Sequence, residues 1–200
     1  MYLIFFFTVL LLAFSPGPNV VLMIDNGLKY HIKYAIFAVF GTVTALFIYA
    51  IFSIFCIQGI FNISKNFYNI LKVLGTLYLV YLGLKNIFYK HGFKIKEENV
   101  YIPPKRKKLF AEAFFCCITN PKILFVYIAL MPNYIVSEKN VLIQNLVLAM
   151  IQISTVSLAM ITYIIIARKA SHLFKNKIKY VSYISGMVMI FLAASIFLNN

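Results

Sequence analysis

Long uncharged stretches alternate with short polar ones along almost the whole chain. A helix needs about 20 mostly apolar residues to cross a bilayer. The stretches that meet this requirement are residues 1–24, 35–59, 67–88, 111–135, 141–167 and 180–198. The pattern therefore predicts an all-α, polytopic membrane protein with six transmembrane helices, in which residues 1–200 form a single transmembrane domain.

The composition agrees with a membrane protein and excludes three other classes. Apolar residues make up 62% of the 200 residues and charged residues 12%, against about 45–50% and about 25% in ordinary soluble domains. A soluble fold of this length would have to expose large apolar patches, which soluble monomers rarely do. A soluble globular enzyme, a disordered chain and a secreted disulfide scaffold are therefore excluded. The three cysteines have no metal-type spacing, and we expect neither a metal site nor a cofactor.

The 19 Lys and Arg residues set the expected orientation. Fifteen of them fall on the side of the segments after the first, third and fifth stretches, with Lys85 at the end of the third stretch included, three fall on the other side, and Lys122 lies inside the fourth stretch. Basic loops stay in the cytoplasm, so both termini are predicted outside. Residues 90–110 then form a cytoplasmic linker between half one, residues 1–89, and half two, residues 111–200. Because the charges lie in short loops between apolar stretches, they indicate a lipid bilayer as the partner and no nucleic acid.

Four of the six prolines lie inside predicted helices. Pro16 and Pro18 fall in the first helix, and Pro121 and Pro132 fall in the fourth. Proline breaks or kinks a helix, and broken backbone at membrane depth persists only beside protein or a water-filled cavity. The two helices begin two three-helix halves, which cross in opposite senses because three is odd. The sequence therefore predicts an inverted 3+3 repeat with broken helices 1 and 4, a plan found in many secondary transporters.

The residues around each break suit a new helix start. Residues 15–18 are Ser-Pro-Gly-Pro and residues 119–121 are Thr-Asn-Pro, and capping residues followed by proline favour helix N-termini. Two half-helices are then expected to begin near the midplane, where their positive dipole ends attract substrate carboxylates. The expected substrate-binding residues are Ser15, Pro16, Gly17, Pro18, Asn19, Thr119, Asn120, Pro121 and Lys122.

Lys122 and Gly17 carry more specific expectations. Lys122 adds a full positive charge to the site, and the alternative is that the prolines only kink their helices while Lys122 snorkels to the interface. Gly17, between two prolines, is expected either to approach the substrate closely or to take backbone angles open only to glycine.

Three motifs resemble one family. Residues 15–19, Ser-Pro-Gly-Pro-Asn, with Asn-Gly-Leu at 26–28, are similar to the N-terminal signature of the LysE/RhtB family of amino-acid exporters. Residues 71–83 resemble that family's third-helix motif, and Thr-Asn-Pro-Lys at 119–122, followed by Met-Pro at 131–132, resembles its fourth-helix motif. The resemblance covers nearly the whole chain. It implies a small protein of the bacterial inner membrane that exports amino acids or related metabolites, with proton coupling as the usual proposal.

One departure from the family concerns acidic residues. Many members carry an acid a few positions after Gly41, whereas residues 42–47 here contain none. The remaining candidates for gating or coupling are Asp25 and Glu112, both expected near the cytoplasmic side. The alternative for each is an interfacial charge paired with a loop lysine.

The predicted function is export of an amino acid or a small zwitterionic metabolite. Few ionisable residues fall inside the predicted helices, and no His does. A metal exporter would need convergent carboxylates, His or Cys, and an intramembrane enzyme would need a nucleophile with a base or paired carboxylates, so we expect no enzyme. The alternatives are an exporter of another small solute or cation, and a membrane scaffold subunit that transports nothing.

Small residues predict close helix contacts. Gly75 and Gly83 share one helix face, and Gly41 with Ala45 forms a small-xxx-small face. These contacts lie either within one protomer or between the copies of a homodimer, and the sequence leaves both open.

Overall fold

The computed structural model describes residues 1–15, 17–62, 105–136 and 139–169, with isolated positions between 73 and 88 and between 183 and 194. The described ranges are helical apart from short connections. The elements are α1 (Tyr2–Ala13), α2 (Pro18–Lys29), α3 (Ile32–Asn62), α5 (Arg106–Ile118), α6 (Pro121–Phe125), the π-helix η1 (Val126–Leu130), the 3₁₀-helix η2 (Met131–Tyr134) and α7 (Val141–Lys169). Most of the predicted third and sixth helices, most of the motif at 71–83 and residues 90–104 of the predicted linker lie outside the described residues.

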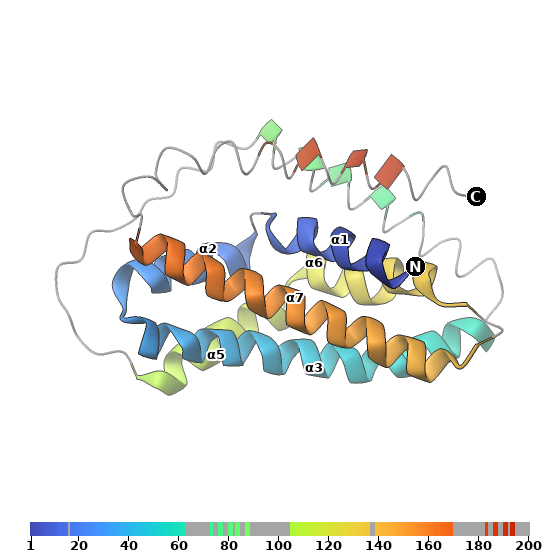
Figure 1. Ribbon diagram of the computed structural model, residues 1–200, viewed down its shortest axis with the longest axis horizontal. Helices are drawn as coiled ribbons and strands as arrows, with labels where there is room; N and C mark the ends of the chain where they lie inside the picture. Colours follow the sequence, from blue (N-terminus) through green and yellow to red (C-terminus); the bar gives the residue numbers. More distant parts are fainter. Residues whose placement is uncertain are drawn as a thin grey trace.

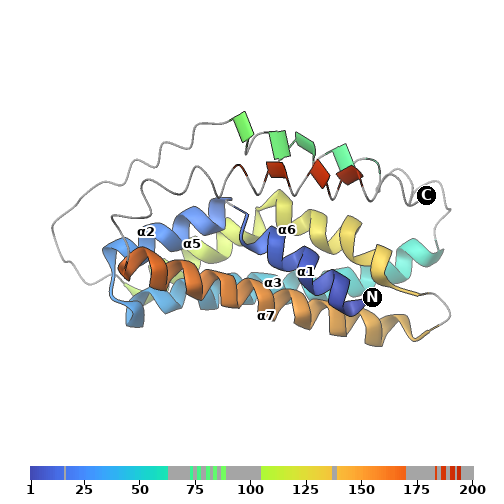
Figure 2. The same cartoon turned by 45° about the horizontal axis from the view of Figure 1, so that its top comes forward.

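Within the part of the chain that the structure describes, two helices are long and apolar enough to cross a membrane unbroken, Ile32–Phe55 within α3 and Val141–Lys169 as α7. They lie alongside each other through the middle of the structure (Figures 1 and 2). Large apolar side chains cover their outer surfaces, including Phe40, Phe55, Ile143 and Leu158. This surface suits lipid contact, because a lipid environment removes the cost of exposing apolar groups to water.

Two bent helix pairs flank the long helices. Tyr2–Ala13 and Pro18–Lys29 meet at 60°, and Arg106–Ile118 and Pro121–Tyr134 meet at 51°. The predicted breaks in the first and fourth helices are therefore present. The pairs run in opposite directions (Figure 1), and the Phe5 ring near the start of the first lies 5.1 Å from the Tyr134 ring at the end of the second.

Glycines allow several helices to approach closely. A Cβ at Gly41 would collide with the Phe110 carbonyl of α5, and a Cβ at Gly27 would lie 2.6 Å from the Ile164 carbonyl of α7. Gly83 lies against Gly186, where a Cβ would come within 2.9 Å of the Gly186 carbonyl. The faces predicted around Gly41 and Gly83 thus make contacts within one protomer. Gly75 lies outside the described residues.

Basic side chains gather at one end of the helices. The Arg168 guanidinium at the end of α7 donates to the Tyr30 carbonyl after α2, at 3.2 Å. The Arg106 guanidinium at the start of α5 lies 5.2 Å from the centre of the Phe37 ring near the start of α3. The ends of α2 and α7 and the starts of α3 and α5 therefore share one side, as the predicted cytoplasmic side requires.

Candidate functional site

The first break separates α1 from α2 without a side-chain cap. Gly17 is the N-cap residue and Pro18 occupies the first turn of α2, a position that suits proline because its missing N–H needs no partner there. The sequence predicts the capping residue at Ser15, whereas the N-cap of α2 is Gly17, which has no side chain to cap the helix. Gly17 has φ −164° and ψ 178°, an extended conformation open to any residue, so the predicted glycine-only angles are wrong. Pro16 lies outside the described residues.

The second break, by contrast, carries its own cap. Asn120 is the N-cap of α6, and its Oδ1 accepts from the backbone N–H of Lys122 at 3.0 Å. Pro121 takes the first helical position. Thr119 contributes differently, since its hydroxyl donates to the Phe115 carbonyl at 2.7 Å. The predicted helix start after Thr-Asn-Pro is therefore confirmed, with Asn120 as the capping residue.

Lys122 crosses from the second break to the first. Its side chain is 8% exposed, and its Nζ donates to the carbonyls of Leu12 and Ser15, each at 3.0 Å. The Leu12 carbonyl lies in the last turn of α1 and the Ser15 carbonyl just beyond the helix, on the side where the helix dipole is negative. The ammonium therefore balances the helix end. This burial contradicts the alternative in which Lys122 snorkels to the interface.

Each break also receives a tyrosine from the long helix of the other half. Tyr163 of α7 donates its hydroxyl to the Phe14 carbonyl, at 2.8 Å. Tyr49 of α3 donates its hydroxyl to the Ile118 carbonyl. Both acceptors are carbonyls released where a helix stops, so both breaks are stabilised by protein donors, as the interior of a membrane protein demands.

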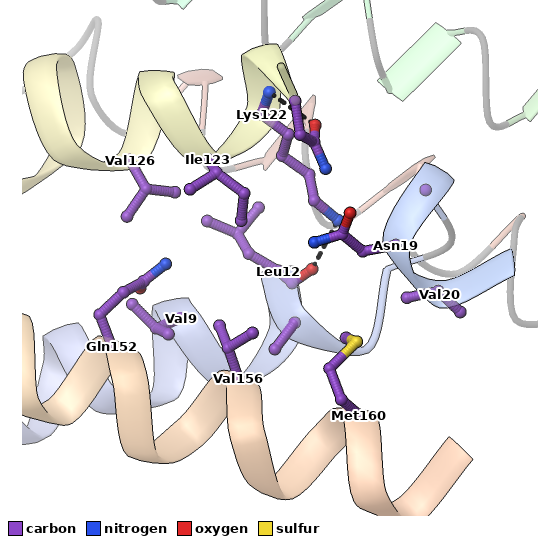
Figure 3. A pocket seen from close by; sticks show the side chains of 13 residues that line it. Val9, Leu12, Asn19, Val20, Lys122, Ile123, Val126, Gln152, Val156 and Met160 are labelled. Atoms are coloured by element: carbon purple, nitrogen blue, oxygen red, sulfur yellow. Dashed lines mark hydrogen bonds between the residues drawn. The ribbon is translucent and has the colours of Figure 1, made fainter. Parts of the chain in front are cut away.

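A cavity lies between the two breaks (Figure 3). Apolar side chains of α1, α2, α6, η1 and α7 form most of its wall. The other lining residues are Gly17, Asn19, Asn120, Lys122 and Gln152. The cavity has a volume of about 20 Å³, room for about one water molecule, so it is narrow in this conformation.

Two buried amides in the cavity wall have unused hydrogen-bonding atoms. Asn19 is 5% exposed and Gln152 is 1% exposed. Among the described residues, Oδ1 and Nδ2 of Asn19 and Oε1 of Gln152 have no hydrogen-bond partner. The Cys117 thiol lies within interaction range of the Asn19 amide, but a thiol is only a weak partner. Sequence reasoning included Asn19 and missed Gln152, whose signal is a neutral amide in the middle of an apolar helix.

The predicted site residues thus divide into two groups. The structure brings Gly17, Asn19, Asn120 and Lys122 to the cavity wall. Ser15, Pro18, Thr119 and Pro121 form the adjoining backbone of the two breaks, and of these Ser15 contributes a carbonyl to Lys122.

Residues 10–200 match the LysE type translocator family. The chain belongs to this family. It is therefore a multi-pass membrane protein of an efflux-transporter family, and the resemblance seen in its three motifs is confirmed.

Curated relatives agree with the family. The chain is 29% identical to a protein named "Uncharacterized membrane protein YrhP" of Bacillus subtilis, over 70% of each chain. It is 26% identical to the homoserine/homoserine lactone efflux protein of Salmonella typhimurium, over 80% of this chain and 76% of the relative. It is 24% identical to an "Uncharacterized membrane protein" of Vibrio cholerae, over 83% of this chain and 80% of the relative. No solved structure matches.

The acidic candidates of this LysE-type translocator lie away from the cavity wall. Asp25 pairs with Lys29 at 2.9 Å, and Glu112 lies 3.8 Å from Lys108. Both pairs join residues four apart on one helix and are partly exposed. These contacts are those expected of interfacial charges paired with a nearby lysine, and a role in gating or coupling stays a prediction.

Proposed function

We propose that the protein exports amino acids or related small zwitterionic metabolites from the cytoplasm across a bacterial inner membrane, coupled to protons. The family supports export of a small solute. The relatives named homoserine/homoserine lactone efflux proteins support a substrate of amino-acid size and chemistry. In this role the protein is a secondary transporter and not an enzyme.

The observation that carries the proposal is the meeting of the two breaks at one cavity. The start of α2 has no side-chain cap, and Lys122 of α6 reaches across to the same place. An ammonium has three N–H donors, and two of those of Lys122 go to α1 carbonyls. The third donor and the uncapped N–H groups of α2 suit a substrate carboxylate.

Transport requires the narrow cavity to open to each side in turn. We assign residues 1–89 and 111–200 to two inverted halves joined by a cytoplasmic linker, with both termini outside. The opposite directions of the two bent pairs and the reciprocal tyrosine contacts support this plan. Rocking of one half against the other would then expose the cavity alternately, as in other inverted-repeat transporters.

The charge of the cavity wall favours this function over its alternatives. The lining residues include one cationic side chain and no carboxylate, which disfavours a cation as the substrate because like charges repel in a low-dielectric interior. The family supports transport over a membrane scaffold that transports nothing.

Efflux from proteoliposomes tests the proposal. Purified protein is reconstituted in vesicles loaded with labelled amino acids that carry neutral, acidic or basic side chains, with and without a proton gradient. We expect saturable efflux of some of these amino acids, faster with the gradient than without it. Equal efflux across the panel and in protein-free vesicles would reject amino-acid export.

Thiol labelling tests the orientation, on a background from which the native cysteines have been removed. We expect Asn99→Cys, in the predicted cytoplasmic linker, to resist an impermeant thiol reagent in intact cells. Asn140→Cys, which precedes α7 on the opposite side, should react. The reverse pattern would invert the predicted topology and the direction of export.

A further inference from the structure

The buried amides of Asn19 and Gln152 are an unexplained feature of the cavity. Burying a polar group without a hydrogen bond is unfavourable, because the group loses its bonds to water. Among the described residues, the other buried amides avoid that loss except Asn26, whose Nδ2 also has no hydrogen-bond partner. Gln144, on α7 like Gln152, donates to the Val136 carbonyl at 2.9 Å. Asn145, also on α7, donates to the Ser53 hydroxyl at 3.1 Å.

The two amides come from different helices and converge on one space. Asn19 lies in the first turn of α2, and Gln152 lies near the middle of α7. Figure 3 shows both side chains directed toward the cavity, with Lys122 entering from α6. Among the described residues, the atoms without a hydrogen-bond partner are two acceptors, Oδ1 of Asn19 and Oε1 of Gln152, and one donor, Nδ2 of Asn19, and the Asn19 amide has the weak Cys117 thiol within interaction range.

We propose that Asn19 and Gln152 are the specificity-determining residues of the transport site, and that they select amino acids with a small, uncharged, hydrogen-bonding side chain. This inference rests on the proposed function. The substrate carboxylate binds the Lys122 ammonium. The neutral amide oxygens of Asn19 and Gln152 accept hydrogen bonds from the substrate ammonium and from the hydroxyl of the substrate side chain. The apolar remainder of the wall surrounds the carbon skeleton.

The same arrangement rejects basic amino acids. A second substrate cation would enter a space whose described lining holds the Lys122 ammonium and no acidic side chain. Neutral oxygens stabilise an additional cation far less than a carboxylate does at low dielectric. We therefore expect threonine or serine to be exported in preference to lysine or arginine.

Substitutions at Gln152 test the assignment through a change of preference, measured as efflux of threonine and lysine from proteoliposomes. Gln152→Glu adds a carboxylate of nearly the same shape, and we expect the lysine-to-threonine ratio to rise about tenfold or more. Gln152→Met keeps the volume and removes the hydrogen-bonding atoms, so threonine efflux should fall about tenfold while valine efflux changes little. Ser154→Ala, at an exposed position two residues along α7, is the matched control and should change neither.

The outcomes separate this inference from the proposed function. Threonine export by the wild type with an unchanged preference in both Gln152 variants would overturn the subsite and leave the exporter intact. Export of lysine by the wild type as fast as threonine would also overturn it. Export of no amino acid by the wild type would reject both. Because Gln152→Glu places an acid at membrane depth, Gln152→Met provides a second test that adds no charge.

Discussion

The two helix breaks differ in how their backbone groups are satisfied. At the second break Asn120 caps the helix that follows it, and Tyr49 binds the carbonyl left by the helix before it. At the first break no side chain caps α2, and the carbonyls at the end of α1 accept from Lys122 and Tyr163. The second break therefore has a helix cap from its own residues in addition to Tyr49 of the other half, whereas the first is open at α2 and depends on the other half for both Lys122 and Tyr163.

This difference shows where a ligand can act. A capped N-terminus has already used one of its free donors, so the uncapped start of α2 is the better place for a carboxylate. Lys122 connects the two breaks because it lies in the first turn of α6 and its ammonium binds the Leu12 carbonyl of α1. A carboxylate that attracts Lys122 would weaken its hold on the Leu12 and Ser15 carbonyls, which couples substrate binding to the packing of the two halves.

The largest expected effect comes from Lys122→Met. The change removes the charged donor from two buried carbonyls and from the substrate, and hydrogen bonds to charged groups contribute about 1.5–3 kcal/mol each. We expect export of carboxylate substrates to fall by about tenfold to a hundredfold, measured as efflux from proteoliposomes. Lys139→Met, in the exposed connection before α7, is the control. Wild-type export by Lys122→Met would mean that this lysine only stabilises α1.

Gly17→Val tests whether Gly17 at the first break serves transport or only helix packing. A Cβ at Gly17 would lie 3.4 Å from Nζ of Lys122, so Ala is tolerated while the branched Val side chain pushes against the ammonium. We expect Gly17→Val to lose most export at near-normal expression, and Gly17→Ala to keep more of it.

The contrasting variant lies on the same helix. Gly27→Ala places a Cβ 2.6 Å from the Ile164 carbonyl, so we expect it to reduce folded protein, detected as loss of a monodisperse peak after detergent extraction. If Gly17→Val destabilises the protein as much as Gly27→Ala, Gly17 is a packing residue.

Pro121→Ala sharpens the comparison at the second break. Alanine favours a continuous helix by about 3 kcal/mol relative to proline in a helix interior, and it supplies an N–H that proline lacks. Asn120 and Tyr49 still stabilise the second break in this variant. We therefore expect Pro121→Ala to lose less export than Gly17→Val. Thermal stability should stay equal or rise. Full export by Pro121→Ala combined with Asn120→Ala would show that the second break is an ordinary kink.

The smallest effects come from the two tyrosines. Tyr163→Phe and Tyr49→Phe each leave one buried carbonyl without its donor, at a cost of about 1–3 kcal/mol. The loss of stability should be larger for Tyr49→Phe, because Lys122 remains at the first break when Tyr163 is lost. Thermal unfolding of the two variants in one detergent measures the difference, and a larger loss for Tyr163→Phe would reverse the comparison.

Sequence reasoning could locate the breaks but not their partners. Pro18, Asn120 and Pro121 are local signals, since a fixed φ angle and a capping oxygen act within one turn. The contacts of Lys122 join residues 110 and 107 positions apart, and no local pattern identifies them. Gln152 could not be assigned to the cavity from the sequence. Apolar residues occupy most faces of α7, so only tertiary packing determines which face of this helix points inward.

The central claim is that both breaks act on one substrate, and a double-mutant cycle for binding tests it most directly. Equilibrium binding of radiolabelled L-threonine is measured on the wild type, Lys122→Met, Gly17→Val and the double variant. The account predicts that each single change weakens binding and that the double variant is little worse than the worse single one, with a coupling energy of about 1 kcal/mol or more. Strictly additive losses, or threonine binding that survives both changes, would contradict a shared site.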